Sequence, residues 1–282
     1  MAPPSPSPSA GGPAARFAGV LDAASIAAEL TDAETVIGNP MSTSEEVADA
    51  GVRLQLAFRA LAGVPEIDDA VLGLISAESR PTIERVVHAR QFVQARSAAM
   101  EATEPPTTLP ATLPAWTIAA PEHADVLRAH YAEAEALTGI PWYWLAAIHL
   151  QETRMGRIIG VSSAGAVGPM QFLPSTWAEC CTGDPTDTRD AIIGAATYLQ
   201  QSGAPTDMAA AVYQYNPNEG YVALVTAYAE NLRDVPALYD GYHAWQVFSS
   251  TSAGTVRIPV GFTAAEPVDA AEHLAAHPDD AA

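Results

Sequence analysis

Glu152 is the residue whose type and position point most directly to chemistry. It lies near the end of a predicted helix over about 141–155, which contains no glycine before Gly156. Leu145, Ile148 and Glu152 fall at i, i+3 and i+7, so they share one face of that helix. A carboxyl group in an apolar stripe is desolvated, which raises its pKa toward the value that a general acid needs near neutral pH.

The same glutamate has a simpler interpretation as one half of a buried ion pair. His149, Arg154 and Arg157 are close to it in sequence and could each neutralise its charge. Structural ion pairs also perturb pKa values, so the helical position of Glu152 does not by itself establish a catalytic role. The motifs that follow Glu152 along the chain favour the catalytic interpretation over the ion pair.

Two short motifs follow Glu152-Thr153. A stretch of glycine and other small residues begins at Ser162 and ends in Gly168-Pro169-Met170-Gln171, just before a short helix marked by Pro174-Ser175. Tyr215-Asn216 comes later and ends another predicted helix, because the residue before a proline leaves the helical region. Small residues let backbone pass close to a ligand or to another segment of the chain.

Taken in order, these three motifs resemble the signatures of the soluble lytic transglycosylase (SLT) family, which cleaves peptidoglycan glycan strands. The usual forms in that family are Glu-Ser, Gly-Leu-Met-Gln and Ala-Tyr-Asn. The resemblance covers about 120–235, under half of the chain, and implies a lysozyme-like helical domain. Thr153 replaces the usual serine and keeps its hydroxyl, Pro169 removes a backbone donor, and Gln214 adds bulk beside Tyr215.

The resemblance implies that a single carboxyl group does the catalysis. Glu152 would protonate the glycosidic oxygen after a muramic acid residue and then draw a proton from the C6 hydroxyl of that sugar. The hydroxyl closes onto C1, so the product is a 1,6-anhydro sugar and no water is consumed. One carboxyl can act twice because it ends the first step deprotonated. No metal or organic cofactor is implied.

The resemblance also implies a set of substrate-binding residues around Glu152. Ser162 matches a serine that bonds the N-acetyl or nearby sugar groups, and Tyr215 matches a tyrosine near the catalytic carboxylate. Asn216 is expected to hold backbone as a cap more than to touch sugar. The full expected set is Thr153, Ser162, Met170, Gln171, Tyr215 and Asn216.

Two other functions remain open at this point. A hydrolytic muramidase of the same fold needs a second carboxylate aimed at a water molecule, and the nearby candidates are Glu219, Asp184, Asp187 and Asp190. A non-catalytic wall-binding or scaffold protein needs no carboxyl group in an apolar stripe, so the intact Glu152 argues against it. Analysis of the reaction products distinguishes all three.

Composition restricts the partners. The net charge is −20 and all 13 basic residues are arginine, which argues against binding of nucleic acid. No apolar run is long enough for a membrane span. Residues 1–10 lack the positive and apolar regions of a signal peptide, although a cell-wall enzyme must be exported. We expect a monomer that is secreted or wall-associated, or one that acts from a phage particle.

The predicted organisation is mainly α. Residues 1–14 are predicted to be disordered, residues 15–102 to form a smaller accessory helical domain that could meet cell-wall partners, and the Pro-rich residues 103–121 to form a linker. The lysozyme-like domain follows over 122–262 and includes a short C-terminal β-hairpin. Residues 263–282 are predicted to be an acidic disordered tail.

Two local features have their own interpretations. Asp184, Asp187 and Asp190 invite comparison with a calcium loop, but the central glycine and the bidentate glutamate of that loop are missing, so we expect an acidic turn with a helix cap. Cys180 and Cys181 are adjacent, and a disulfide between neighbours is strained. We therefore expect two buried thiols, with a redox-active pair as the alternative.

Overall fold

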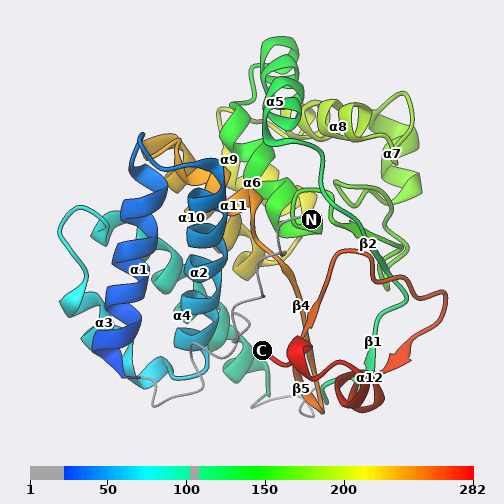
Figure 1. Ribbon diagram of the computed structural model, residues 1–282. Coiled ribbons are helices and arrows are strands. Elements are labelled where there is room, and N and C mark those ends of the chain that lie inside the picture. The colour runs from blue at the N-terminus through cyan, green and yellow to red at the C-terminus, as the bar shows by residue number, and fades with distance from the viewer. Residues whose placement is uncertain (1–21, 102–107) are drawn as a thin grey trace, which may run out of the picture.

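The computed structural model describes residues 22–101 and 108–282, so the predicted disorder of residues 1–14 lies outside the described residues. Helices dominate the described chain, which confirms the mainly α class (Figure 1). No helix within these residues has both the length and the hydropathy needed to cross a bilayer.

The first helical group precedes the predicted catalytic region. It contains the α-helices α1 to α4 and a short 3-10 turn, with these bounds: α1 Ala23–Gly38, α2 Ser44–Ala62, η2 Pro65–Ile67, α3 Asp68–Leu74 and α4 Arg80–Glu101. Thr43 begins α2 as a capping box, because its hydroxyl accepts from the Glu46 N–H while the Glu46 carboxylate accepts from the Thr43 N–H. This pair of hydrogen bonds fixes the start of α2.

The second helical group follows, and its bounds are α5 Ala124–Thr138, α6 Trp142–Thr153, α7 Pro174–Cys180, α8 Thr188–Gln201, α9 Met208–Tyr215, α10 Glu219–Asp234 and α11 Leu238–His243. Helix α6 is buried along most of its length and contacts α5, α8 and α10. Pro141 immediately precedes α6, where its missing N–H leaves no helical hydrogen bond unmade. This surrounded position lets α6 carry a functional residue on a rigid element.

The two helical groups share one hydrophobic core. Helix α10 packs on both α4 and α6, and α11 packs on α2. A single cluster of buried side chains therefore runs from Ile26 in α1 to Trp245 after α11. The division of the chain into an accessory and a catalytic domain stays a prediction, but the two groups are packed against each other without a gap in that core.

Short antiparallel strands form the rest of the molecule. Their bounds are β1 Thr112–Leu113, β2 Thr117–Ile118, β3 Ile158–Ile159, β4 Val247–Thr251, β5 Gly254–Ile258 and β6 Val268–Asp269. Strands β4 and β5 form the predicted hairpin, with Val247 paired with Ile258 and Thr251 with Gly254. Strand β1 pairs with β6, and β2 pairs with β3.

Two predicted flexible segments are part of this β region. Leu113 and Ile118 are buried in a second, smaller core, so the described part of the segment predicted to be a linker is folded. The prediction of a disordered tail over 263–282 was wrong. Helix α12 (Ala270–Ala276) and the turn η3 (Pro278–Asp280) follow β6 there. Burial of Ala270 and the ion pair between Asp280 and Arg257 hold this segment to the hairpin.

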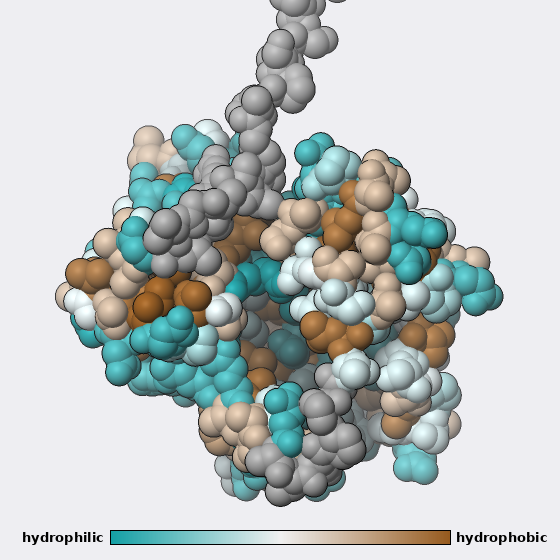
Figure 2. Space-filling model, turned by 90° about the horizontal axis from the view of Figure 1, so that it is seen from below, coloured by the Kyte–Doolittle hydropathy of each residue, from teal (hydrophilic) through white to brown (hydrophobic). Residues whose placement is uncertain are grey.

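The surface view from below shows a face that is hollowed near its centre, with hydrophilic residues at depth (Figure 2). The helices α1 to α4 lie on one side of the molecule and the β strands with α12 lie toward the other (Figure 1). The fold thus places the α6 helix between two flanking groups of elements.

Candidate functional site

Helix α6 places Glu152 in its last turn. Leu145 and Ile148 on the same face are fully buried, as the i, i+3, i+7 spacing predicts. Glu152 itself is only partly buried. The helix therefore anchors the carboxyl group through its apolar neighbours and leaves part of that group accessible.

Tyr221, near the start of α10, is the hydrogen-bond partner of Glu152. Its hydroxyl donates to Glu152 Oε1 at 2.5 Å. Burial raises the pKa of the Glu152 carboxyl to about 7, although the Tyr221 hydrogen bond and the positive charge of Arg154 act in the opposite direction. A carboxyl group with this pKa is populated in both protonation states near neutral pH, as an acid that later acts as a base requires.

The three basic residues close to Glu152 in sequence form hydrogen bonds with groups other than its carboxylate. His149 is fully buried, its Nδ1 lies 2.7 Å from the Tyr131 hydroxyl, and burial lowers its pKa to about 3. Arg157 donates to the carbonyl of His243 at 2.8 Å, and Arg154 donates to the carbonyl of Leu150 at 2.6 Å. Within the described residues, none of the three basic groups forms an ion pair with Glu152, so the simple ion-pair interpretation is wrong.

Thr153 connects α6 to the loop that follows. Its side chain is fully buried, donates to the carbonyl of Pro169 at 2.6 Å and accepts from the N–H of Gly156 at 3.0 Å. Its only proton is donated to Pro169 and the side chain is fully buried, so the hydroxyl cannot contact a sugar in this structure. The expectation that Thr153 binds substrate is therefore corrected: Thr153 positions the loop relative to Glu152.

The loop from 162 to 172 is held by short-range hydrogen bonds. The Ser162 hydroxyl accepts from the N–H of Ala166 at 3.0 Å, and Val167 pairs with Phe172 as an isolated bridge. Gln171 has a φ of 51° and donates its side-chain amide to the carbonyl of Gly168 at 2.9 Å. Ser162 and Gln171 both remain partly exposed, so of the predicted binding residues they can still reach a ligand.

A hydrogen bond between Tyr215 and Met170 also holds this loop in place. Met170 is fully buried, and the hydroxyl of Tyr215 donates to its carbonyl at 2.6 Å. Met170 is thus a core residue, which corrects its expected contact with substrate. Tyr215 supports the loop through this hydrogen bond, whereas Tyr221 bonds the carboxylate. Asn216 is the C-terminal cap of α9, and its carbonyl accepts from the N–H of Asn218 at 2.7 Å.

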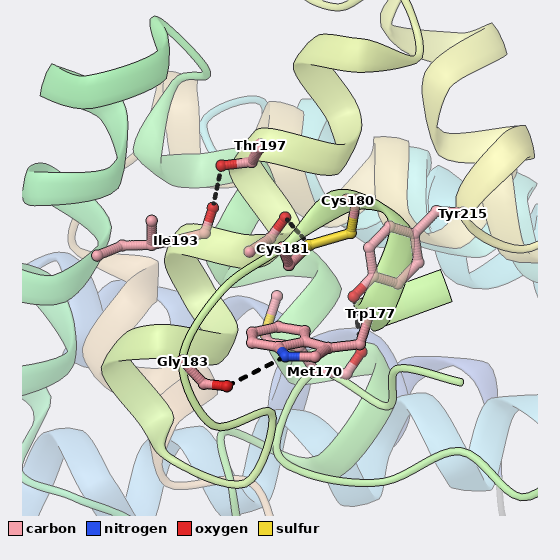
Figure 3. Close-up of a disulfide and its surroundings, with 9 residues drawn as sticks. Met170, Trp177, Cys180, Cys181, Gly183, Ile193, Thr197 and Tyr215 are labelled. Atoms are coloured by element: carbon pink, nitrogen blue, oxygen red, sulfur yellow. Dashed lines mark hydrogen bonds between the residues drawn. A yellow bond between two sulfur atoms is a disulfide. The ribbon is translucent and has the colours of Figure 1, made fainter. Parts of the chain in front are cut away.

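Figure 3 shows the surroundings of Tyr215 and Met170. The Trp177 indole donates to the carbonyl of Gly183 at 3.3 Å, and a disulfide joins Cys180 to Cys181. The expectation of two free thiols was wrong. Helix α7 ends at Cys180, and the backbone becomes extended at Cys181, which brings the two sulfur atoms together.

Sequence reasoning missed the role of Tyr221. Tyr221 lies in the first turn of α10 and is buried. The feature of the sequence that could have predicted this role is the tyrosine hydroxyl, because a buried tyrosine hydroxyl needs a hydrogen-bond partner. Glu152 was a buried carboxyl in need of a donor, so the two requirements could have been matched.

The other candidate carboxylates have local partners. Asp187 caps α8 by accepting from the N–H of Asp190 at 2.9 Å, and Asp190 accepts from the N–H of Asp184 at 3.1 Å. Asp184 in turn accepts from Thr186. Glu219 forms an ion pair with Arg96 on α4. The predicted acidic turn with a helix cap is confirmed, and no cluster of metal-ligating side chains occurs in the part of the chain that the structure describes.

A comparison with known proteins finds one partial relationship. A stretch of 79 residues is 37% identical to the membrane-bound lytic murein transglycosylase F of Thiobacillus denitrificans. The stretch makes up 28% of this chain and 17% of the relative, so the chain matches only a small part of that protein. No family model and no solved structure matches the chain. Over this stretch, the chain is related to a lytic murein transglycosylase.

Proposed function

We propose that this protein is a lytic transglycosylase that cleaves the β-1,4 bond between N-acetylmuramic acid and N-acetylglucosamine in peptidoglycan. The observation that carries the proposal is Glu152, a partly accessible carboxyl on a rigid helix with a pKa of about 7 and a tyrosine donor at 2.5 Å. The partial similarity to a lytic murein transglycosylase supports the same chemistry.

The proposed reaction uses Glu152 twice. The protonated carboxyl gives its proton to the glycosidic oxygen as the bond to C1 of the muramic acid breaks. The resulting carboxylate then takes the proton of the C6 hydroxyl, whose oxygen forms the new bond to C1. Because the carboxyl regains its proton, the cycle closes without water.

Tyr221 has a positioning role in this scheme. It holds Oε1 of Glu152, so the other oxygen is free to exchange a proton with the sugar. Ser162 and Gln171 are the partly exposed polar residues on the neighbouring loop, and we assign them to contacts with sugar substituents. Thr153, Met170 and Tyr215 fix the position of that loop.

The hydrolytic alternative needs a second catalytic carboxylate, and the four candidates for it do not support this alternative. Hydrolysis with inversion needs a carboxylate about 6.5–9.5 Å from the acid, facing a water on the other side of the sugar. Asp184, Asp187 and Asp190 make local caps and Glu219 pairs with Arg96, so all four have other structural roles. This favours transglycosylation by a single carboxyl.

The remaining proposals concern the setting of the enzyme. Glycan strands of peptidoglycan are its substrate, and we propose that it acts as a monomer that is secreted or associated with the cell wall. The exposed faces of α1 to α4 could meet other cell-wall proteins. The exclusion of nucleic acid rests on the net charge of −20.

Mass spectrometry of soluble products from purified sacculi tests the proposal, with wild type compared with Glu152→Gln. We expect 1,6-anhydro muropeptides from the wild type and their loss in the variant. Products that are heavier by one water and reducible would show hydrolysis instead. Binding to sacculi without any soluble product would favour the scaffold interpretation.

A further inference from the structure

A pocket of about 320 Å³ lies between the two helical groups, beside α6. Its walls come from α2, α4, α6 and α10, together with Trp245 after α11. Three arginines line it, one from each of α2 and α4 and one at the end of α6: Arg59, Arg90 and Arg154. The pocket therefore concentrates positive charge in a chain whose net charge is −20.

The positive charge in this pocket is not neutralised by carboxylates. Within the described residues, none of the three guanidinium groups has a carboxylate partner within 4.0 Å. Six other arginines do form such ion pairs: Arg53, Arg85, Arg96, Arg189, Arg233 and Arg257. Burial, together with the positive charges of Arg154 and Arg90, lowers the pKa of Arg59 to about 10. The carboxylates that act on the group are more distant, Asp68 on Arg90 and Glu152 on Arg154.

The arginines are held in place by uncharged contacts. Arg59 lies over the Phe248 ring at 4.3 Å from its centroid, and Arg90 donates to the carbonyl of Phe58. These contacts are made by the guanidinium groups of Arg59 and Arg90 and leave further N–H groups of each available. The three side chains are thus oriented without being neutralised, which favours an anion as the missing partner.

Trp245 contributes a buried polar group to the wall of the pocket. Its side chain lines the same pocket and is 4% exposed, yet its indole N–H has no hydrogen-bond acceptor. A buried donor without an acceptor is unfavourable, so this wall of the pocket contains an unsatisfied polar group. The amide N–H groups of Gln55 and Gln94 are already engaged with backbone carbonyls, those of Gln246 and Ala62. These two amide groups therefore have their partners within the protein.

The pocket lies next to the proposed catalytic acid. Gln151 and Arg154, which line it, flank Glu152 in sequence. Leu224, which also lines it, is three residues after Tyr221 on α10, or about 4.5 Å along the helix axis. An extended peptide covers about 3.3 Å per residue, so a short peptide on a sugar held at Glu152 could reach the pocket.

We propose that this arginine pocket binds a carboxylate of the peptide stem that peptidoglycan carries on its muramic acid residues. The inference rests on the proposed function for the identity of the substrate. A carboxylate suits the site because guanidinium groups bind it through two parallel hydrogen bonds. The pocket would then select peptide-bearing strands and orient them on Glu152.

Direct binding of a stem peptide tests the pocket without any need for catalysis. The probe is an N-acetylated stem tripeptide, titrated by calorimetry, beside the same peptide with its carboxyl groups amidated. We expect the free acid to bind and the amide not to bind. Arg59→Gln and Arg90→Gln should each weaken binding at least tenfold. Arg96→Gln is the matched control, because Arg96 is on α4 but pairs with Glu219 outside the pocket.

Two outcomes of the titration would overturn the proposal. One is equal binding of the acid and the amide, and the other is unchanged affinity in both pocket variants. Melting curves confirm that the variants are folded. Removal of one of three unneutralised charges should not lower the melting temperature. If Arg59→Gln fails to fold, Arg90→Gln carries the test, and Arg59→Lys keeps the charge but loses the planar fork.

Kinetic measurements test the pocket proposal and the proposed transglycosylase activity independently of each other. On peptide-bearing strands, Arg59→Gln should raise KM about tenfold with little change in kcat. On strands stripped of stems, which keep only the lactyl carboxylate, the Arg59→Gln effect should vanish; its persistence would overturn the stem assignment. Peptide binding without any product from the wild type would contradict the transglycosylase activity alone. Products that do not depend on stem carboxylates would contradict the pocket alone.

Discussion

At the scale of single residues, two partly buried carboxyl groups of this protein have the same raised pKa but different surroundings. Burial raises the pKa of both Glu152 and Glu34 to about 7. Glu34 on α1 accepts from the hydroxyl of Thr82 on α4 at 2.7 Å. Glu152 is held by Tyr221 at the end of α6. Glu34 therefore offers a matched control for Glu152 that titrates in the same range outside the proposed site.

The first prediction concerns pH. Because the pKa of Glu152 is higher in the folded state than its ordinary value of 4.5, folding is favoured with the proton bound. The contribution of Glu152 to the free energy of unfolding is fully present below about pH 4.5 and is lost as the pH rises through about 7. Glu152→Gln should therefore raise the free energy of unfolding at pH 8 by about 1–3 kcal/mol, allowing for screening by solvent, and urea denaturation at pH 8 measures it.

The Glu34→Gln variant distinguishes the effect of a raised carboxyl pKa on stability from the effect of losing the catalytic carboxyl. It should stabilise the protein at pH 8 for the same reason, while activity on sacculi stays within about twofold of the wild type. Glu152→Gln should lose activity by about a thousandfold or more, consistent with loss of a general acid and base. Loss of activity in Glu34→Gln, with its fold intact, would contradict the assignment of the acid to Glu152 alone.

The second prediction concerns Tyr221. Its hydrogen bond lowers the pKa of Glu152, so Tyr221→Phe should raise that pKa and move the alkaline limb of the pH–activity profile upward. Activity at the optimum should fall about tenfold because the carboxyl loses its orientation. Tyr215→Phe is the comparison, since that hydroxyl bonds the Met170 carbonyl, and its alkaline limb should stay in place. A limb that moves equally in both variants would refute the specific role of Tyr221.

At the scale of elements, the loop from 162 to 172 owes its shape to contacts with other segments. Thr153 at the end of α6 and Tyr215 at the end of α9 each bond a carbonyl of the loop. Gly168 lies against the segment before α8, where a Cβ atom would come within 1.8 Å of the Pro185 carbonyl oxygen. The loop is thus fixed from three directions, which allows Ser162 and Gln171 to keep a defined position.

The third prediction compares two glycines of this loop. Gly168 and Gly165 both have a positive φ, 76° and 85°, so alanine strains the backbone at either position. At Gly165 the added Cβ meets open space, whereas at Gly168 it collides with backbone. Gly165→Ala should cost about 1 kcal/mol of unfolding free energy, and Gly168→Ala about 3 kcal/mol or more together with most of the activity. Equal melting temperatures for the two variants would show that the Pro185 contact does not hold the loop.

At the scale of the whole molecule, α1 to α4 are joined to the predicted catalytic helices by close packing. A Cβ atom at Gly51 in α2 would lie 2.1 Å from the carbonyl oxygen of Gly241 in α11. Asn231 of α10 donates to the carbonyl of Thr82 in α4 at 2.9 Å, and it is fully buried. The arginine pocket is formed only where these two groups meet. Its assembly therefore depends on their docking.

The fourth prediction tests this docking. Gly51→Ala should lower the free energy of unfolding by at least 2 kcal/mol because the helices must separate to admit the methyl group. Gly73→Ala in α3 is the control: its Cβ meets nothing within 4 Å, and alanine should stabilise that helix by about 0.5–1 kcal/mol. We expect the wild type to unfold in one calorimetric transition. Two resolved transitions, with only the first shifted by Gly51→Ala, would establish the separate accessory domain instead.

The sequence by itself determined the local features of this protein. The i, i+3, i+7 spacing and Gly156 placed α6 around Glu152, because the hydrogen bonds within a helix involve neighbouring residues. The apolar stripe of α6 predicted the desolvated carboxyl group. The alternation of apolar residues around Gly254 predicted the hairpin of β4 and β5.

Only the tertiary structure decided which groups meet across the chain. Tyr221, rather than Tyr215, bonds Glu152, and Thr153 and Met170 face the core, because these outcomes depend on how α6, α9 and α10 cross. The tail over 263–282 is ordered because a distant strand, β1, pairs with it. The arginine pocket is assembled from four helices that are far apart in sequence. Each of these results depends on contacts between remote segments, and no local pattern in the sequence encodes them.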